Sequence, residues 1–250
     1  MGKTVLRISL LLALFLAVPA GGTAAAGGSL FFNDGIGDEQ LLYRISFGSG
    51  DTHVYDTYSF KRTASGDRPS YEILVSSTGE DGERITQEIR LTCPDLKPLR
   101  VHYLKTAGDG KSGREEFTAA FKGDKVEFNA SGKDKILKAP NDTYLAAVHV
   151  LRGFPFGGVK RVSFNVFYYQ PGITQYYAEN KGLEKVRVPA GEFECYRIES
   201  GATGMASLMV PKAQYWYARE GSHVLVKYTG KKMGGNQQTW ELAKVQSGGR

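Results

Sequence analysis

Residues 162–168 read Val-Ser-Phe-Asn-Val-Phe-Tyr, and this stretch carries the pattern that decides the fold. Val162, Phe164, Val166 and Tyr168 fall on alternate positions, so their side chains share one side of an extended backbone. A period of two is typical of a strand in an antiparallel sheet that packs one face on a hydrophobic core. Phe167 lies between them and places an aromatic ring on the opposite face.

The same alternation recurs along most of the chain. Tyr43, Ile45 and Phe47 form one such set, and Val224, Val226 and Tyr228 form another. Further strands are expected at 54–60, 71–77, 85–92, 99–105, 114–121, 126–128, 183–189, 193–200, 205–210, 214–219 and 238–245. Glycine-rich turns separate many of them. Short strands at this spacing predict an all-β fold built as a meander, a sandwich or a barrel.

One segment departs from this pattern and predicts a short helix over 142–152. Asn141 and Asp142 offer a helix N-cap, and the residues that follow are almost all apolar except His149. Gly153 and Pro155 suit the end of a helix. A helix that is apolar nearly all round must be covered on several sides. We therefore expect it to plug one end or the concave face of the sheet.

The N-terminal 26 residues have the features of a secretory signal peptide. Lys3 and Arg7 precede an apolar run from Ile8 to Val18, and small residues follow with candidate cleavage points after Ala20 or Ala26. The run is about half the ~20 residues that a membrane span needs. We expect residues 27–250 to be one exported, periplasmic β domain with flexible ends and no membrane-spanning segment.

The charges exclude some classes of partner. The chain has a net charge of +6, but its basic residues are interspersed with acidic ones and form no run longer than a pair. A nucleic-acid-binding protein needs a clustered basic face. We therefore expect no nucleic-acid partner.

Two cysteines, Cys93 and Cys195, leave two interpretations open. In an oxidising compartment they are a candidate disulfide, because exported proteins commonly form such bonds. They can equally be two separate buried thiols.

Local signals for catalysis or metal binding are weak. The chain contains no Gly-x-Ser-x-Gly motif, and its histidines (His53, His102, His149 and His223) form no pair at the spacing of a zinc motif. We expect no metal, no cofactor and no enzymatic activity.

Aromatic residues carry the strongest functional signal. They cluster between 154 and 177 and return at Tyr215-Trp216-Tyr217. One interpretation is a sheet with its core on one face and aromatic rings packed under loops on the other. The other is a sheet that is apolar on both faces, with one face lining a cleft for a hydrophobic ligand. The candidate ligand-binding residues are Phe154, Phe156, Phe167, Tyr169, Tyr176 and Trp216.

Several segments together resemble a known family. The resemblance is carried by residues 186–198 (Val-Arg-Val-Pro-Ala-Gly-Glu-Phe-Glu-Cys-Tyr-Arg-Ile), by Tyr215-Trp216-Tyr217-Ala218 with 223–228, and by 142–156. This order of segments is similar to the domain-of-unknown-function 3108 family of exported bacterial proteins, over about residues 40–245. The resemblance implies a Gram-negative envelope protein with a curved antiparallel sheet, a clam or partly open barrel, around a helix. It implies no established activity and no catalytic residues.

These observations favour a non-catalytic periplasmic binding or carrier protein for an apolar, lipid-like ligand. Two alternatives remain: a structural or protein-interaction module of the cell envelope, which would have an envelope protein as partner, and an envelope-directed hydrolase.

Overall fold

The strands of this chain hydrogen-bond side by side in one sheet. The computed structural model describes residues 29–48, 53–65, 68–79, 82–108, 113–145, 147–168, 172–231 and 236–247. Within these ranges the sheet has fifteen strands, in the order β8-β7-β6-β5-β4-β3-β2-β1-β15-β14-β13-β12-β11-β10-β9. The predicted antiparallel all-β fold is confirmed, and the sheet is open rather than closed.

The strand bounds follow the alternating segments of the sequence. The first half of the sheet contains β1 (Glu39–Phe47), β2 (His53–Ser65), β3 (Arg68–Thr78), β4 (Arg84–Thr92), β5 (Pro98–Thr106), β6 (Arg114–Lys122), β7 (Lys125–Ala130) and β8 (Lys133–Lys138). The second half contains β9 (Thr143–Tyr144), β10 (Arg161–Tyr168), β11 (Gly172–Val188), β12 (Gly191–Ala202), β13 (Ala213–Ala218), β14 (Leu225–Lys231) and β15 (Gln237–Ser247).

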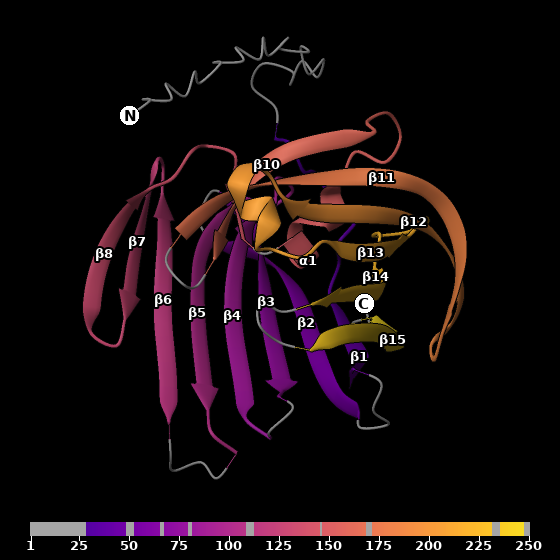
Figure 1. Ribbon diagram of the computed structural model, residues 1–250, viewed down its shortest axis with the longest axis horizontal. Coiled ribbons are helices and arrows are strands. Elements are labelled where there is room, and N and C mark those ends of the chain that lie inside the picture. The colour runs from indigo at the N-terminus through magenta and orange to yellow at the C-terminus, as the bar shows by residue number, and fades with distance from the viewer. Residues whose placement is uncertain are drawn as a thin grey trace, which may run out of the picture.

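The two halves meet where the first strand pairs with the last. β1 and β15 are antiparallel, with Glu39 opposite Ser247 and Phe47 opposite Gln238. Every other neighbouring pair is also antiparallel except the short parallel pair of β9 and β10. In Figure 1 the strands of the first half lie close to vertical, and those of the second half cross them close to horizontal. The short helix α1 (Ala147–Val150) lies between the two sets of strands, inside the curved sheet.

The core lies on the concave side of the curved sheet, where the two halves pack together. Phe167 of β10 contacts Phe121 of β6 and Phe128 of β7, with ring centroids 5.4 and 6.0 Å apart. Phe31, which precedes β1, packs edge-on against Phe164 and Tyr144. Rings from both halves of the chain therefore share one hydrophobic core.

The predicted helix over 142–152 is wrong in its extent. The segment forms β9, then α1, then the 3-10 turn η1 (Leu151–Gly153). Asp142 does not cap a helix, because its side chain accepts a hydrogen bond from Asn165 Nδ2 at 2.8 Å and its carbonyl accepts one from the Asn165 amide at 3.0 Å. These bonds draw the start of the segment into the sheet, and the helical part is shorter than expected.

The expected position of this helical segment is confirmed. Val150 and Leu151 are fully buried. The Tyr217 hydroxyl of β13 donates to the Val148 carbonyl at 3.1 Å, and the His149 ring lies 5.9 Å from that of Tyr58 in β2. The segment therefore closes one end of the concave surface.

The expected strand over 205–210 is also wrong. Residues Gly204–Leu208 form a second 3-10 turn, η2, in the connection between β12 and β13. Gly204 has a φ of +61°, a left-handed conformation that favours glycine and ends the strand before it.

The expected signal peptide, residues 1–26, lies outside the described residues. None of the described helices is long and apolar enough to span a membrane.

Candidate functional site

The concave face carries a continuous band of aromatic side chains that crosses the seam between the two halves. We call this band the aromatic belt; its members are Tyr43, Tyr58, Tyr168, Tyr176, Tyr215, Tyr228 and Trp240. They come from β1, β2, β10, β11, β13, β14 and β15. Strand register brings them together, because Tyr215 lies opposite Tyr228, and Tyr228 lies opposite Trp240.

Ring contacts link most of the belt. The Trp240 ring lies 4.9 Å from that of Tyr228 and 6.1 Å from that of Tyr58. Tyr215 lies 5.1 Å from Tyr228, and Tyr43 lies 5.3 Å from Tyr58. Tyr168 and Tyr176 form a further pair at 5.6 Å. Tilted and edge-on rings at these separations attract one another beyond the burial of their area.

Burial keeps the belt hydroxyls neutral. It raises the pKa of Tyr228 to about 12 and places the pKa of Tyr58 and Tyr215 well above the ordinary value. The Asp56 carboxylate adds to the shift at Tyr58, and the Tyr228 hydroxyl adds to it at Tyr215. Burial also raises the pKa of Tyr168, and the neighbouring Tyr176 adds to the shift. The belt therefore offers uncharged hydroxyl groups within an apolar wall, an arrangement that suits a largely apolar ligand with few polar atoms.

One part of the belt reaches solvent. Tyr58 and Tyr215 are buried, whereas Tyr228 and Trp240 are half-buried and Tyr168 is 39% exposed. Tyr228 and Trp240 also pack against the hydrophobic core, so the belt is a partly open margin of that core.

The structure places the candidate ligand-binding residues that it describes in several different parts of the fold. Of the five that lie in the described residues, only Tyr176 belongs to the belt. Phe167 is buried between the two halves of the sheet, as described above. Tyr169 lies outside the described residues.

Phe154 and Phe156 lie at the closed end. Phe154 is buried, and its ring centroid lies 5.3 Å from that of Phe156. Phe156 stacks on Tyr196 at 4.5 Å and contacts the His223 ring at 4.6 Å. These contacts support packing of the helical segment.

Trp216 faces the opposite side of the sheet from the belt. It lies between the inward-facing Tyr215 and Tyr217 in β13, and its indole N–H donates to the Glu184 carboxylate. Its ring is 5.8 Å from the Lys227 ammonium group. The structure thus places Trp216 on the face opposite the belt, whereas Trp240, within the predicted strand at 238–245, lies on the belt face opposite Tyr228.

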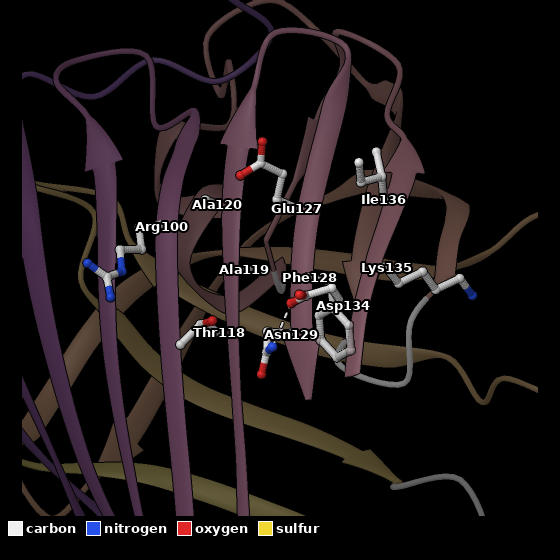
Figure 2. Close-up of a pocket in the computed structure, with 10 residues that line it drawn as sticks. All are labelled: Arg100, Thr118, Ala119, Ala120, Glu127, Phe128, Asn129, Asp134, Lys135 and Ile136. Carbon is white, nitrogen blue, oxygen red and sulfur yellow. Dashed lines mark hydrogen bonds between the residues drawn. The ribbon is translucent and has the colours of Figure 1, made fainter. Parts of the chain in front are cut away.

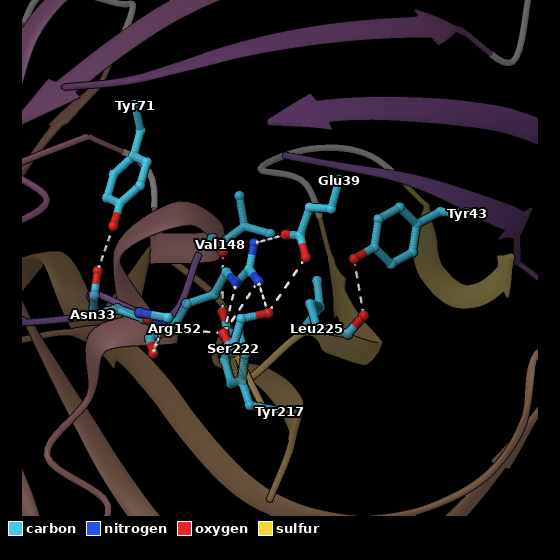
Figure 3. A network of polar contacts seen from close by, with 10 residues as sticks. Asn33, Glu39, Tyr43, Tyr71, Val148, Arg152, Tyr217, Ser222 and Leu225 are labelled. Carbon is cyan, nitrogen blue, oxygen red and sulfur yellow. Dashed lines mark hydrogen bonds and ion pairs between the residues drawn. The ribbon is translucent and has the colours of Figure 1, made fainter. Parts of the chain in front are cut away.

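A buried polar network seals the end of the sheet that the helical segment covers (Figure 3). Arg152 is 1% exposed, and its guanidinium contacts the Glu39 carboxylate at 2.5 Å and the Ser222 hydroxyl at 2.7 Å. Asn33 donates to the carbonyls of Arg152 and Ser222. The network therefore ties η1, β1, the segment before β1 and the β13–β14 turn together.

His149 lies next to this network. Burial lowers the pKa of His149 to about 4, and the nearby positive charge of Arg152 lowers it further in the same direction. His149 is therefore neutral near neutral pH and acts as a packing side chain, with its ring against Tyr58.

The outer face of the first half of the sheet has two shallow hollows. One, of about 520 Å³, lies over β5–β8, and its lining includes Arg100, Thr118, Ala120, Glu127 and Ile136 (Figure 2). The second, of about 600 Å³, lies over β2–β5 and shares Arg100 with the first. Their linings are mixed in charge, and neither includes a belt residue.

An acidic residue and a histidine meet on this outer face. His102 Nε2 lies 2.8 Å from Glu116 Oε1. Hydrogen bonds from His102 and then from Arg114 lower the pKa of Glu116, which is open to solvent. The carboxylate is therefore held in its ionised form on the surface.

The two cysteines are free in this structure, and both are buried. Cys93 lies beside Tyr71, whereas Cys195 in β12 lies near Glu184 and Glu194. Burial raises the pKa of the Cys195 thiol to about 12, so that thiol is unreactive in the folded protein.

Within the described ranges, no group of three or more histidine, cysteine or carboxylate side chains could hold a metal ion.

Comparisons with known proteins identify a family and a similar fold. The family model described as protein of unknown function DUF3108 matches residues 42–237. A search of the curated proteins finds no match to this chain. Among solved structures, the β-barrel-like protein of the domain of unknown function DUF1849 from Brucella abortus has a TM-score of 0.56 and 11% identity, covering 87% of this chain and 98% of its own.

A second solved structure is less similar. It is named as a "putative lipoprotein" from Parabacteroides distasonis and has a TM-score of 0.43 and 12% identity, with coverage of 87% of this chain and 99% of its own. At such identities the Brucella structure supports the barrel-like fold alone.

Proposed function

This chain belongs to the DUF3108 family of proteins of unknown function. We propose that it is a non-catalytic binding or carrier protein for an apolar, lipid-like ligand. The observation that supports the proposal is the aromatic belt on the concave face, with Tyr168, Tyr228 and Trp240 partly open to solvent. We further propose that the protein works in the periplasm, because residues 1–26 have the pattern of an export signal.

The belt has the chemistry that an apolar ligand needs. Aromatic rings supply contact area at a low cost in side-chain entropy, and each one buried against a ligand contributes roughly 1.5–3 kcal/mol. The neutral hydroxyls of Tyr168 and Tyr228 can donate to the few polar atoms of a lipid-like molecule. A few such contacts correspond to an affinity of about micromolar.

Binding of a fluorescent apolar molecule tests the proposal. The dye 1-N-phenylnaphthylamine brightens when it leaves water, and we expect it to brighten on addition of the protein. Trp240→Leu and Tyr228→Leu should each weaken dye binding by about tenfold, the loss of one aromatic contact. Native mass spectrometry of the protein purified from cells should also show a co-purified lipid.

The matched control is Trp216→Leu, which removes the same type of side chain from the outer face. It should leave dye binding within about twofold of the unchanged protein. Equal weakening by Trp216→Leu and Trp240→Leu, or no dye binding at all, would contradict a site at the belt.

A protein-interaction module is the second candidate, and the free edge of β8 favours it. Among the strands that the structure describes, β8 has a sheet neighbour on one side only, and its Ile136 is 68% exposed. An exposed edge strand can accept a strand from another protein. A photo-reactive side chain at position 136 that captures an envelope protein in living cells, together with an empty belt in mass spectrometry, would favour this module over a carrier.

The third possibility, an envelope-directed hydrolase, depends on the pair of His102 and Glu116. Hydrolysis of envelope material that is lost in His102→Ala but kept in Trp240→Leu would favour the hydrolase and count against a non-catalytic role.

A further inference from the structure

The connection between β12 and β13 displays apolar side chains in water. Met205 and Leu208 of η2 and the following Met209 are 87%, 88% and 71% exposed. These are the three most exposed large apolar side chains of the described residues, and we call them the apolar tip. Apolar groups gathered at one exposed site mark an interaction surface more often than singly scattered ones do.

The apolar tip is held by an ordered backbone. The Val210 and Met209 amides donate to the Ala206 carbonyl at 2.9 and 3.1 Å, and the Thr203 amide donates to the Gln175 carbonyl at 2.9 Å. Ala206 and Val210 pack against the hydrophobic core. The loop therefore buries its small inner side chains and presents its long ones outward, so the exposure is built into the fold.

Cationic groups surround a hollow of about 430 Å³ beside the apolar tip. Its lining includes Arg161, Lys181 and Lys212 together with Glu179 and Glu199. Lys212 contacts Glu199 at 3.2 Å, and Lys181 contacts Glu179 at 2.9 Å. The carboxylates lie deeper, because Lys212 is 65% exposed and Glu199 only 16%. The face turned toward solvent is thus cationic.

An exposed apolar group flanked by cations has the chemistry of a bilayer-binding element. Apolar side chains enter the boundary between headgroups and acyl chains, and lysine and arginine contact anionic headgroups. The cations beside the tip match the anionic headgroups of a phospholipid surface, and this charge complementarity favours a membrane as the occupant. We propose that the apolar tip inserts into the surface of a membrane containing anionic phospholipid, with Arg161, Lys181 and Lys212 facing the headgroups.

The apolar tip follows the strand end that pairs with one end of the aromatic belt. Ala202 at the end of β12 pairs with Tyr176 of β11, and η2 begins two residues later. The hollow itself lies on the outer face, because Tyr177, which lines it, is adjacent to the belt residue Tyr176 in β11 and points to the opposite side of the sheet. Docking itself does not depend on what the belt binds.

Sedimentation with vesicles tests the proposal on the protein as purified from the expressing cell. We expect the protein to partition onto vesicles of phosphatidylethanolamine and phosphatidylglycerol more strongly than onto phosphatidylcholine. The triple variant Met205→Ser, Leu208→Ser and Met209→Ser should lose at least about tenfold in partitioning. The double variant Arg161→Gln and Lys212→Gln should lose the preference for the anionic vesicles.

The matched control removes exposed apolar side chains elsewhere. Ile136→Ser, Leu183→Ser and Val245→Ser, which alter side chains that are 68%, 44% and 42% exposed, should leave partitioning within about twofold. Thermal unfolding of each variant checks that the sheet is intact. Trp240→Leu should also partition normally, which separates membrane docking from ligand binding.

Three outcomes would overturn the proposal. They are equal partitioning of the tip variant and the unchanged protein, absence of partitioning onto either vesicle, and capture of an envelope protein by a cross-linker at position 205 without any vesicle binding.

Discussion

Arg152 shows how one residue can organise the end of the fold. It is a long charged side chain that the structure buries almost completely, and every group around its guanidinium is an acceptor or an aromatic face: Glu39, Ser222 and the ring of Phe60 at 4.7 Å. Such a pair costs desolvation energy when it is buried and becomes costly to break afterwards. The pair of Arg152 and Glu39 therefore contributes mainly by specifying that η1 packs against β1 and the β13–β14 turn.

Arg152→Met should therefore destabilise the protein by about 3–5 kcal/mol, because it leaves the Glu39 carboxylate buried without a counter-charge. Chemical denaturation would measure the loss. The double variant Arg152→Met and Glu39→Gln should recover a large part of it. Equal instability of the single and double variants would show that the charge pair is not the cause.

His149 predicts a dependence of stability on pH. Its pKa is lowered from 6.5 to about 4 in the folded protein by burial and by Arg152. Between these values the unfolded chain binds a proton that the folded chain does not, so stability falls as pH falls through this window. We expect the His149 contribution to the free energy of unfolding to drop by about 2 kcal/mol between pH 7 and pH 5.

Denaturant titrations at the two pH values would measure this drop. The variant His149→Gln lacks the titrating ring and should show a correspondingly smaller loss. A pH dependence identical to that of the unchanged protein would contradict a buried neutral histidine.

At the scale of single elements, η1 depends on a close approach that only glycine permits. A Cβ atom on Gly153 would lie 2.7 Å from the Phe32 amide nitrogen and 2.8 Å from Leu96 Cδ1. The Phe32 amide also donates to the Gly153 carbonyl at 3.0 Å. The helical segment and the segment before β1 therefore touch backbone to backbone.

Gly153→Ala should lower the free energy of unfolding by about 1–3 kcal/mol, the usual cost of overpacking a tight contact. Gly157→Ala is the matched control, because nothing lies within 4 Å of its Cβ position. Thermal or chemical unfolding of both variants would check this, and equal stabilities would mean that the contact relaxes without cost.

β13 shows the limit of local patterning at this scale. The triplet Tyr215-Trp216-Tyr217 must divide its rings between two faces, because adjacent strand residues point to opposite sides. Which face is concave depends on the partners, Tyr228 in β14 and Ile198 in β12. The strand itself was predictable from the sequence, but the face on which each of its rings lies was not.

At the scale of the whole molecule, the sheet depends on the pairing of its first and last strands. β15 lies between β1 and β14, and its Trp240 and Leu242 point into the core or the belt. Without β15 both neighbours would expose unpaired edges, and the two halves of the sheet would lose their direct hydrogen bonds.

Deletion of residues 237–250 should therefore abolish the cooperative unfolding transition, whereas deletion of 248–250 keeps β15 complete and should leave the transition unchanged. Thermal unfolding followed by circular dichroism would distinguish the two. A cooperative transition in the longer deletion would show that each half of the sheet folds without the seam.

The sequence by itself determined the all-β class, most of the strands and the burial of the segment around residue 150, because alternation, glycine turns and apolar content act within a few residues. Only the tertiary structure decided which aromatic rings share the belt, since Tyr43 and Trp240 meet across nearly the whole chain through the β1–β15 register. It also decided that residues 204–208 leave the sheet and carry their apolar side chains into solvent. Faces and edges depend on which distant strands pair, and no local pattern encodes that choice.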